Sequence, residues 1–399
     1  MSRSDSRKPP SIASGPKAAF HPEAPDDRTY KYVCRANDNF QRRYYKDAIT
    51  EYFKAIQAVE VVSPEPSDFL ALLYSNRSAS YFMLRQYTQA KQDADQVVRL
   101  RPNWAKGYLR RAEALLRQHQ FDAAIEDYKC AIKLDTENGT DIKNRLSKAL
   151  MQRDNRRMGF AIEALLPGRD IALERSFTSP VQNRVFEYAE MMKNLIYIVA
   201  DLATRECIAV DACWDVEGIV RFIREENYTL VACIVTHHHF DHVGGSPPPP
   251  YDSIPIKVSG LATLLKKFPH IPAYVHPLDI QPVLSANPSI QPHRLVPSPE
   301  QIRMGGTVLK FLHTPGHTPG SQCVLVNGCR LLAGDTLLGG ICGRTDLPGG
   351  SSESMRHSLS HVLGALEDRV VVLPGHDYGF DWTTIGIERE KGCVGDNIV

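Results

Sequence analysis

The first third of the chain repeats with a period of 34 residues, and this repeat limits the fold more than any other feature. Ala90 and Ala124 lie 34 residues apart, and each follows an aromatic residue by three positions. An earlier unit around Ala48 comes at a longer interval because residues 61–67 are inserted. Small residues let paired helices approach closely, and one pair alone cannot bury a core. The repeat predicts an all-α solenoid over residues 28–153, with three helix pairs and a capping helix.

This helical half resembles the tetratricopeptide repeat domains of chaperone-binding proteins. The resemblance is closest in the stretches LYSNRSA at residues 73–79 and WAKGYLR at residues 104–110. In that family, five side chains clamp the C-terminal carboxylates of heat-shock chaperones. Four of the five positions match here, namely Asn37, Asn76, Lys106 and Arg110. The remaining position, a lysine in the family, is Val33 in this chain.

Two of the matched residues also suit this role on chemical grounds. Lys106 and Arg110 stand four positions apart and therefore share one face of a helix. Cations combined with amide donors on a concave surface suit a terminal carboxylate, so a chaperone tail is the expected partner. The alternative interpretation is that these are solvated charges on a generic repeat scaffold.

From residue 195 the hydrophobic pattern changes to short strands with a few helices between them. Asn327 and Gly328 separate two apolar runs and predict a hairpin turn. Mixed strands and helices indicate an α/β sandwich. We expect this second domain at residues 190–399 and a linker over residues 154–189. The Ser- and Pro-rich residues 1–27 are expected to form a disordered tail.

A cluster of ligand-type side chains follows one apolar run of the second half. Residues 236–242 read THHHFDH, directly after the predicted strand at residues 230–235. Three later strand ends add further histidine or aspartate, each beside glycine or proline. The seven residues are His237, His239, Asp241, His242, His317, Asp335 and His376. Imidazole and carboxylate suit borderline cations, so we expect these loops to meet at one sheet edge and to hold metal.

The motif H-x-H-x-D-H with a later His, Asp and His resembles the metallo-β-lactamase fold over residues 190–385, which implies an αββα sandwich. The resemblance implies two divalent cations, with zinc as the first expectation and iron or manganese as alternatives. One cation belongs to His237, His239 and His317, and the other to Asp241, His242 and His376, with Asp335 as the bridge. The resemblance also implies that Asp211 orients a ligand histidine. The alternative is that all seven are turn residues without metal.

Within that fold the chain is most similar to glyoxalase II, the hydroxyacylglutathione hydrolase, in residues 313–320, 334–337 and 374–378. The resemblance implies a thioesterase for glutathione thioesters. A hydroxide bridging the cations would attack the carbonyl, with Asp241 and Asp335 as the catalytic carboxylates. Arg344 and Tyr378 would bind substrate. An ion pair between Arg344 and Asp346 is the alternative for that arginine.

Two other functions compete with the thioesterase. A persulfide dioxygenase would use one iron held by His237, His317 and Asp335. A chaperone-linked adaptor would keep the second domain as a non-catalytic scaffold. Glyoxalase II itself carries a C-terminal helical domain, and the residues after His376 are too few for one.

Composition narrows the class of protein further. Hydrophobic content of 43% and charged content of 23% are typical of folded globular domains. A net charge of +1 gives no reason to expect nucleic acid or membrane partners. The nine cysteines form no C-x-x-C pair and their count is odd, which favours reduced thiols and a cytoplasmic location.

Overall fold

The computed structural model describes residues 26–62, 67–173, 179–247, 257–379 and 381–396. The chain divides into two compact units, residues 1–157 and 158–399. All nine cysteines lie in the described parts, and each is a free thiol.

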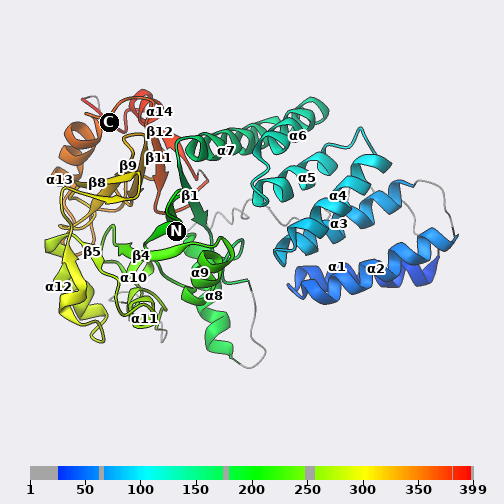
Figure 1. Cartoon of the computed structure of the whole chain (residues 1–399), viewed down its shortest axis with the longest axis horizontal. Helices are drawn as coiled ribbons and strands as arrows, with labels where there is room; N and C mark the ends of the chain where they lie inside the picture. The colour runs from blue at the N-terminus through cyan, green and yellow to red at the C-terminus, as the bar shows by residue number, and fades with distance from the viewer. Residues whose placement is uncertain (1–25, 63–66, 174–178, 248–256, 380, 397–399) are drawn as a thin grey trace, which may run out of the picture. The chain divides into compact units, whose positions relative to one another are not determined.

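The first unit consists of seven helices, drawn from blue to teal in Figure 1. They form three hairpins and a final helix, as the repeat predicts. The helices are α1 (Asp27–Gln41), α2 (Tyr45–Val62), α3 (Asp68–Met83), α4 (Tyr87–Leu100), α5 (Ala105–Arg117), α6 (Phe121–Leu134) and α7 (Gly139–Arg157).

The repeat period appears in this unit as equivalent buried positions. Ala48, Ala90 and Ala124 are each the fourth residue of the second helix in their hairpin, and each is fully buried. Paired charges repeat as well. Arg77 makes two hydrogen bonds of 2.8 Å to Asp93, and Arg111 bonds Asp127 in the same way, one period later. Alanine contacts therefore set the close approach of the helices, and the bidentate pairs hold neighbouring helices together.

The second unit contains two six-stranded sheets. The first has the order β1-β2-β3-β4-β5-β6 and the second β12-β11-β10-β9-β8-β7. The first sheet consists of β1 (Phe160–Leu165), β2 (Ile196–Asp201), β3 (Glu206–Val210), β4 (Thr229–Ile234), β5 (Ala273–Val275) and β6 (Leu295–Pro297). The second consists of β7 (Gln301–Met304), β8 (Thr307–His313), β9 (Gln322–Val326), β10 (Arg330–Gly334), β11 (Val371–Pro374) and β12 (Thr383–Thr384).

Helices pack against both sheets of this unit. The core of the first sheet includes side chains from α8 (Pro180–Met192), α9 (Val216–Glu225), α11 (Leu261–Lys267) and α12 (Pro277–Ala286). A second core joins β9, β10 and β11 to α13 (Ser352–His357), the π-helical turn η2 (Ser358–Leu363) and α14 (Ile385–Glu390). The short helix α10 (Phe240–Val243) and the 3-10 turn η1 (Pro292–Arg294) complete the unit. The predicted α/β sandwich is thus present.

The structure differs from the predicted boundaries at two places. The expected linker over residues 154–189 contains β1 and most of α8, because β1 pairs with the whole of β2 and α8 packs into the core of that sheet. The helix α1 begins at Asp27, inside the segment expected as a tail, and the Asp26 carboxylate caps it by accepting from Thr29 N–H at 2.8 Å. Residues 1–25 lie outside the described residues.

Candidate metal centre

Four strand ends deliver the seven predicted ligands to one place. The strand β4 leads into His237–His242, while β8, β10 and β11 lead to His317, Asp335 and His376. The sequence predicts one sheet edge for these loops, but β4 belongs to the first sheet and the others to the second. Because β8, β10 and β11 run in the same direction, their carboxyl ends lie at the same edge. The centre therefore lies where corresponding edges of the two sheets meet.

The first three ligands form a compact triangle of imidazoles. Ring centroids of His237, His239 and His317 lie 4.5–4.8 Å apart. Nδ1 of His317 donates to the Arg344 carbonyl at 2.7 Å, so its Nε2 faces the triangle. Among the described residues, Nε2 of His237 and Nε2 of His317 are buried and have no hydrogen-bond partner. Buried polar atoms are rarely left without a partner, and a cation between these rings would satisfy both of them.

The other three ligands converge in the same way. Nε2 of His242 lies 3.2 Å from Nε2 of His376 and 3.6 Å from Asp241 Oδ2, and Nε2 of His376 lies 3.4 Å from the same oxygen. Nδ1 of His376 donates to the Met192 carbonyl at 2.7 Å, which orients its ring. Below, His237, His239 and His317 are called the first subset, and Asp241, His242 and His376 the second subset.

Asp335 lies between the two subsets. Its Oδ2 is 3.5 Å from Nε2 of His317 and 3.4 Å from Nε2 of His376, and its Oδ1 is 3.5 Å from Nε2 of His242. Asp335 Oδ1 is buried, and no described residue hydrogen-bonds it. Cβ atoms added at Gly375 or Gly343 would collide with Asp335, so these glycines make room for it. This position fits the predicted bridge.

The pKa values of His237 and His239 in the first subset and of His242 in the second subset are shifted in opposite directions. Burial, helped by neighbouring imidazoles, lowers the pKa of His237 well below its usual range and lowers that of His239 to about 3. Both rings are therefore neutral at neutral pH, which is the form that binds a cation. Burial would also lower the pKa of His242, but the carboxylates of Asp241 and Asp335 outweigh it and raise that pKa to about 10.

The carboxylates of Asp335 and Asp241 remain ionised because the surrounding imidazoles lower their pKa. Burial opposes ionisation of Asp335, but the imidazoles of His376 and His242 more than offset it, and its pKa falls below the usual range. The pKa of Asp241 is lowered by the same two rings against the effect of burial. The neutral imidazoles of His237 and His239 and the ionised carboxylates are the forms that bind divalent cations, and a cation in the second subset would replace the proton that the raised pKa keeps on His242.

Asp211 is not one of the seven predicted ligands, but it hydrogen-bonds His242 of the second subset. Its Oδ2 accepts from His242 Nδ1 at 2.9 Å and from Thr236 Oγ1 at 2.7 Å, and its Oδ1 accepts from Thr236 N–H at 2.8 Å. The bond to His242 directs that ring's Nε2 inward. This is the orienting contact expected for Asp211.

Asn194 and Trp214 are site residues that the sequence reasoning missed. The Asn194 amide Nδ2 lies 3.1 Å from Asp241 Oδ2 and 3.2 Å from His242 Nε2. The Trp214 indole donates to Asn194 Oδ1 at 2.9 Å. Asn194 lies two residues before β2, whose start lies at the same edge as the end of its antiparallel partner β3. That strand-start position is the signal that could have revealed it.

The two predicted substrate residues lie near the cluster on its exposed side. The Tyr378 ring stacks on the His376 ring at 4.9 Å, and 52% of its surface is exposed. Arg344 makes hydrogen bonds of 2.9 and 2.8 Å to Asp346, which is the alternative pairing considered for it. Its backbone carbonyl, however, accepts a hydrogen bond from Nδ1 of His317. Arg344 therefore combines an exposed ion pair with a structural contact to the first subset.

The predicted peptide clamp forms a connected group in the first unit. The Tyr52 hydroxyl donates to Asn37 Oδ1 at 2.6 Å. Burial raises the pKa of Tyr52, while a hydrogen bond with Asn76 and the charge of Arg110 act in the opposite direction, so both residues lie near the same hydroxyl. Burial and the charge of Arg110 lower the pKa of Lys106 to about 8. Tyr52 thus lies close to both amides and to Arg110, and Arg110 in turn lies close to Lys106.

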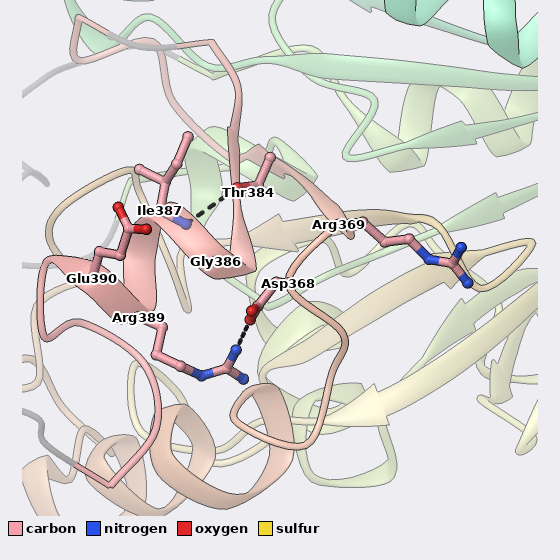
Figure 2. Close-up of a pocket in the computed structure, with 7 residues that line it drawn as sticks. All are labelled: Asp368, Arg369, Thr384, Gly386, Ile387, Arg389 and Glu390. Atoms are coloured by element: carbon pink, nitrogen blue, oxygen red, sulfur yellow. Dashed lines mark hydrogen bonds and ion pairs between the residues drawn. The ribbon is translucent and has the colours of Figure 1, made fainter.

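A surface hollow of about 570 Å³ is present in the second unit (Figure 2). Its lining includes Asp368, Arg369 and Arg389, and none of the seven predicted ligands. Arg389 pairs with Asp368, and Arg369 pairs with Glu367 at 2.6 Å. Both arginines of the hollow are therefore engaged in ion pairs with nearby carboxylates.

Comparison with known families matches both halves of the chain. The model of the Metallo-beta-lactamase superfamily matches residues 193–376, and the Tetratricopeptide repeat model matches residues 105–138. An uncharacterised protein of Aquifex aeolicus is 33% identical over 204 residues, which are 48% of this chain and 87% of that protein. The chain belongs to the metallo-beta-lactamase superfamily of hydrolases, and it carries tetratricopeptide repeats ahead of that domain.

Two further relatives have descriptive names. A probable polyketide biosynthesis zinc-dependent hydrolase, BaeB of Bacillus velezensis, is 29% identical over 49% of this chain and 79% of its own length. A hydroxyacylglutathione hydrolase of Chromohalobacter salexigens is 31% identical over 46% of this chain and 62% of its own length.

Within the described residues, none of the helices is both long enough and apolar enough to cross a membrane.

Proposed function

We propose that the second domain hydrolyses thioesters, with glutathione thioesters as the substrate class, and that two divalent cations assist it. The observation that carries this proposal is the convergence of seven buried or partly buried His and Asp side chains, whose possible ligand atoms fall into groups within 4.8 Å. The relative named hydroxyacylglutathione hydrolase supports the choice of substrate. The unpartnered Nε2 atoms of His237 and His317 support the presence of a cation.

Each group of side chains has a role in this proposal. The first subset would hold one cation and the second subset the other, with Asp335 in contact with both. When bound, divalent cations supply Lewis acidity, which lowers the pKa of water and stabilises negative charge on a carbonyl oxygen. Asp241 and Asp335 are ionised, and Asp241 is buried while Asp335 is partly buried, so both can accept hydrogen bonds from the attacking water and hold it beside the substrate.

Substrate contacts are proposed for the exposed side of the centre. Tyr378 lies flat against His376, and its exposed face offers a surface beside the reacting groups. Arg344 offers a cation for a substrate carboxylate, because its exposed ion pair with Asp346 is weak enough to exchange partners. These contacts would place the thioester carbonyl near Asp335.

The test is turnover of S-lactoylglutathione by the full chain, compared with two histidine variants. His239→Ala removes a ligand of the first subset and is expected to lower kcat/KM by at least about 100-fold. His270→Ala changes an exposed histidine outside the cluster and should leave turnover unchanged. Bound iron with oxygen consumption on glutathione persulfide would replace the thioesterase by a dioxygenase. Cation binding without turnover of either substrate would favour the adaptor.

For the first unit we propose binding of a C-terminal peptide carboxylate, as found on heat-shock chaperone tails. The support is the group around Tyr52, in which the amide of Asn37, the charge of Arg110 and the amine of Lys106 lie together. A carboxylate replacing water there would receive charge-assisted hydrogen bonds. Val33 provides no cation at the fifth position, so we expect a weaker complex than a full clamp gives.

Peptide binding can be tested with one peptide in two chemical forms. A peptide with an acidic free C-terminus should bind, and its amidated form should bind at least about tenfold more weakly. Lys106→Ala should weaken the free form by a similar factor. Lys129→Ala, which removes an exposed partner of Glu126, should have no effect. Equal binding of the free and amidated peptides would exclude carboxylate recognition.

A further inference from the structure

Asn194 is held rigidly against the second subset. It is 1% exposed and forms a bridge to His376 at the start of β2. On either side, Leu195 N–H donates to the Gly375 carbonyl at 2.8 Å, and Asp377 N–H donates to the Lys193 carbonyl at 2.9 Å. The backbone around Asn194 is thereby fixed to the loop that carries a proposed ligand. A half-turn of the terminal amide would exchange the positions of its oxygen and nitrogen.

Trp214 decides which way that amide faces. The indole Nε1 can only donate a hydrogen bond, and it lies 2.9 Å from Asn194 Oδ1. Trp214 is itself 2% exposed and its ring packs edge-on against Phe240. A turned amide would bring two N–H donors together and leave the indole without a partner. The NH₂ group of Asn194 therefore faces the cluster.

Asn194 Nδ2 completes a tetrahedron with the second subset. Its distances to Asp241 Oδ2, His242 Nε2 and His376 Nε2 are 3.1, 3.2 and 3.4 Å. The three ligand atoms are 3.2–3.6 Å from one another. A tetrahedron with edges of about 3.3 Å has its centre about 2.0 Å from each corner, which is the usual Zn–N distance. The amide nitrogen thus takes up one position around a cation in this subset, in addition to the position proposed for Asp335.

An amide nitrogen is a poor occupant of that corner. It offers two hydrogens and no available lone pair to a cation. The first subset has no such neighbour, and the Nε2 atoms of His237 and His317 are instead without partners among the described residues. We propose that Asn194, locked by Trp214, is a positioning residue that weakens the second cation position, so that the centre fills in order, the first subset before the second. This inference rests on the proposed two-cation function.

Stepwise filling has a chemical consequence for the centre. At low cation concentration the protein would hold one cation at the first subset, with Asp335 facing it. The second subset would fill only at higher concentration, when the amide is displaced or turned. The sequence of filling would then depend on one hydrogen bond, between Trp214 and Asn194, that touches neither substrate nor cation.

The experiment is a calorimetric titration of the full chain with Zn²⁺ and, separately, Co²⁺. The natural protein should bind two cations with well-separated affinities. Asn194→Asp keeps an acceptor for the Trp214 indole and presents an oxygen ligand, so it should tighten the second affinity at least about tenfold. Trp214→Phe frees the amide to turn its oxygen inward and should change the second affinity in the same direction. Both variants should leave the first affinity unchanged.

A matched control and two other outcomes make the test decisive. Asn287→Asp changes another buried asparagine, whose amide contacts the Gly244 carbonyl and none of the ligands, and should alter neither affinity. Unchanged second affinity in both Asn194→Asp and Trp214→Phe would overturn the proposal, as would two equal affinities in the natural protein. Failure of the thioesterase proposal would instead appear as absent turnover with the titration behaving as expected.

Discussion

Replacing Asp211 by asparagine should weaken cation binding without disturbing the fold. Asp211 has a left-handed backbone with φ of 54°, which asparagine tolerates as well as aspartate. The amide oxygen of the variant would face Thr236 N–H, which now bonds Oδ1 at 2.8 Å. The amide NH₂ would then face His242 Nδ1, which now donates to Oδ2 at 2.9 Å. Two donors would meet, so the variant favours the form of His242 that loses its Nδ1 proton and keeps a proton on Nε2.

The expected loss of cation affinity follows from the position of that proton, because a proton on Nε2 of His242 blocks the atom that would bind the cation. Nε2 of His242 is the atom that lies 3.2 Å from His376 Nε2, inside the second subset. Loss of an orienting contact to a ligand histidine typically costs about 10- to 100-fold in cation affinity. That factor corresponds to about 1.4–2.8 kcal/mol of binding free energy. We expect the loss to fall on the cation of the second subset.

Zn²⁺ competition against a chromophoric chelator at fixed pH measures this loss. Asp201→Asn is the matched control, because Asp201 is 2% exposed and accepts from Thr204 N–H, Gly306 N–H and Thr307 Oγ1, far along the chain from the ligands. The control should lower the melting temperature and leave the affinity unchanged. Equal Zn²⁺ affinity in Asp211→Asn and the natural protein, with both folded, would refute the reasoning.

Three further predictions concern pH, packing and cation removal. The pKa of Lys106 is lowered to about 8, so its charge is present below that pH and lost above it. Peptide affinity, measured by fluorescence anisotropy, should therefore fall about tenfold from pH 7 to 9.5. The variant Lys106→Arg keeps its charge and should abolish this pH dependence. Leu73 is fully buried, so Leu73→Ala should lower the unfolding free energy of the first unit by about 2–5 kcal/mol, as urea titration would show. The control Val61→Ala changes an exposed side chain and should alter that free energy little. Chelation of bound cations should lower the melting temperature of the second unit by several degrees and leave that of the first unit unchanged, as separate calorimetric transitions would show.

Sequence patterns predict long, regular elements of this chain better than short ones. The equivalence of Ala90 and Ala124 follows from a fixed period, so the amino-acid sequence alone is enough to place the helix pairs. The strand β1 has the sequence FAIEAL, in which Ala, Glu and Leu favour helix, and its pairing with β2 overrides that preference. The strands β5, β6, β7 and β12 have two to four residues, too few for a periodic signal.

In the candidate site, too, residues that belong to a local sequence pattern could be predicted and residues placed by tertiary contacts could not. Candidate ligands directly after apolar runs, such as His237 and Asp335, are visible in the sequence because they belong to a motif, although their strands β4 and β10 lie in different sheets. Asn194 and Trp214 belong to no motif, and their importance depends on a hydrogen bond between the segment before β2 and the segment after β3. Such a contact is set by tertiary packing and has no local pattern in the sequence.

The pairing of β1 determines where this chain can be cut into separately expressed halves. A fragment starting at residue 166 would lose the partner of β2 and leave its backbone N–H and C=O groups facing solvent along six residues. Unprotected edges of that kind recruit other chains and promote aggregation. Cleavage between Arg157 and Met158 keeps the edge covered, and a soluble hydrolase fragment for crystallisation depends on that choice.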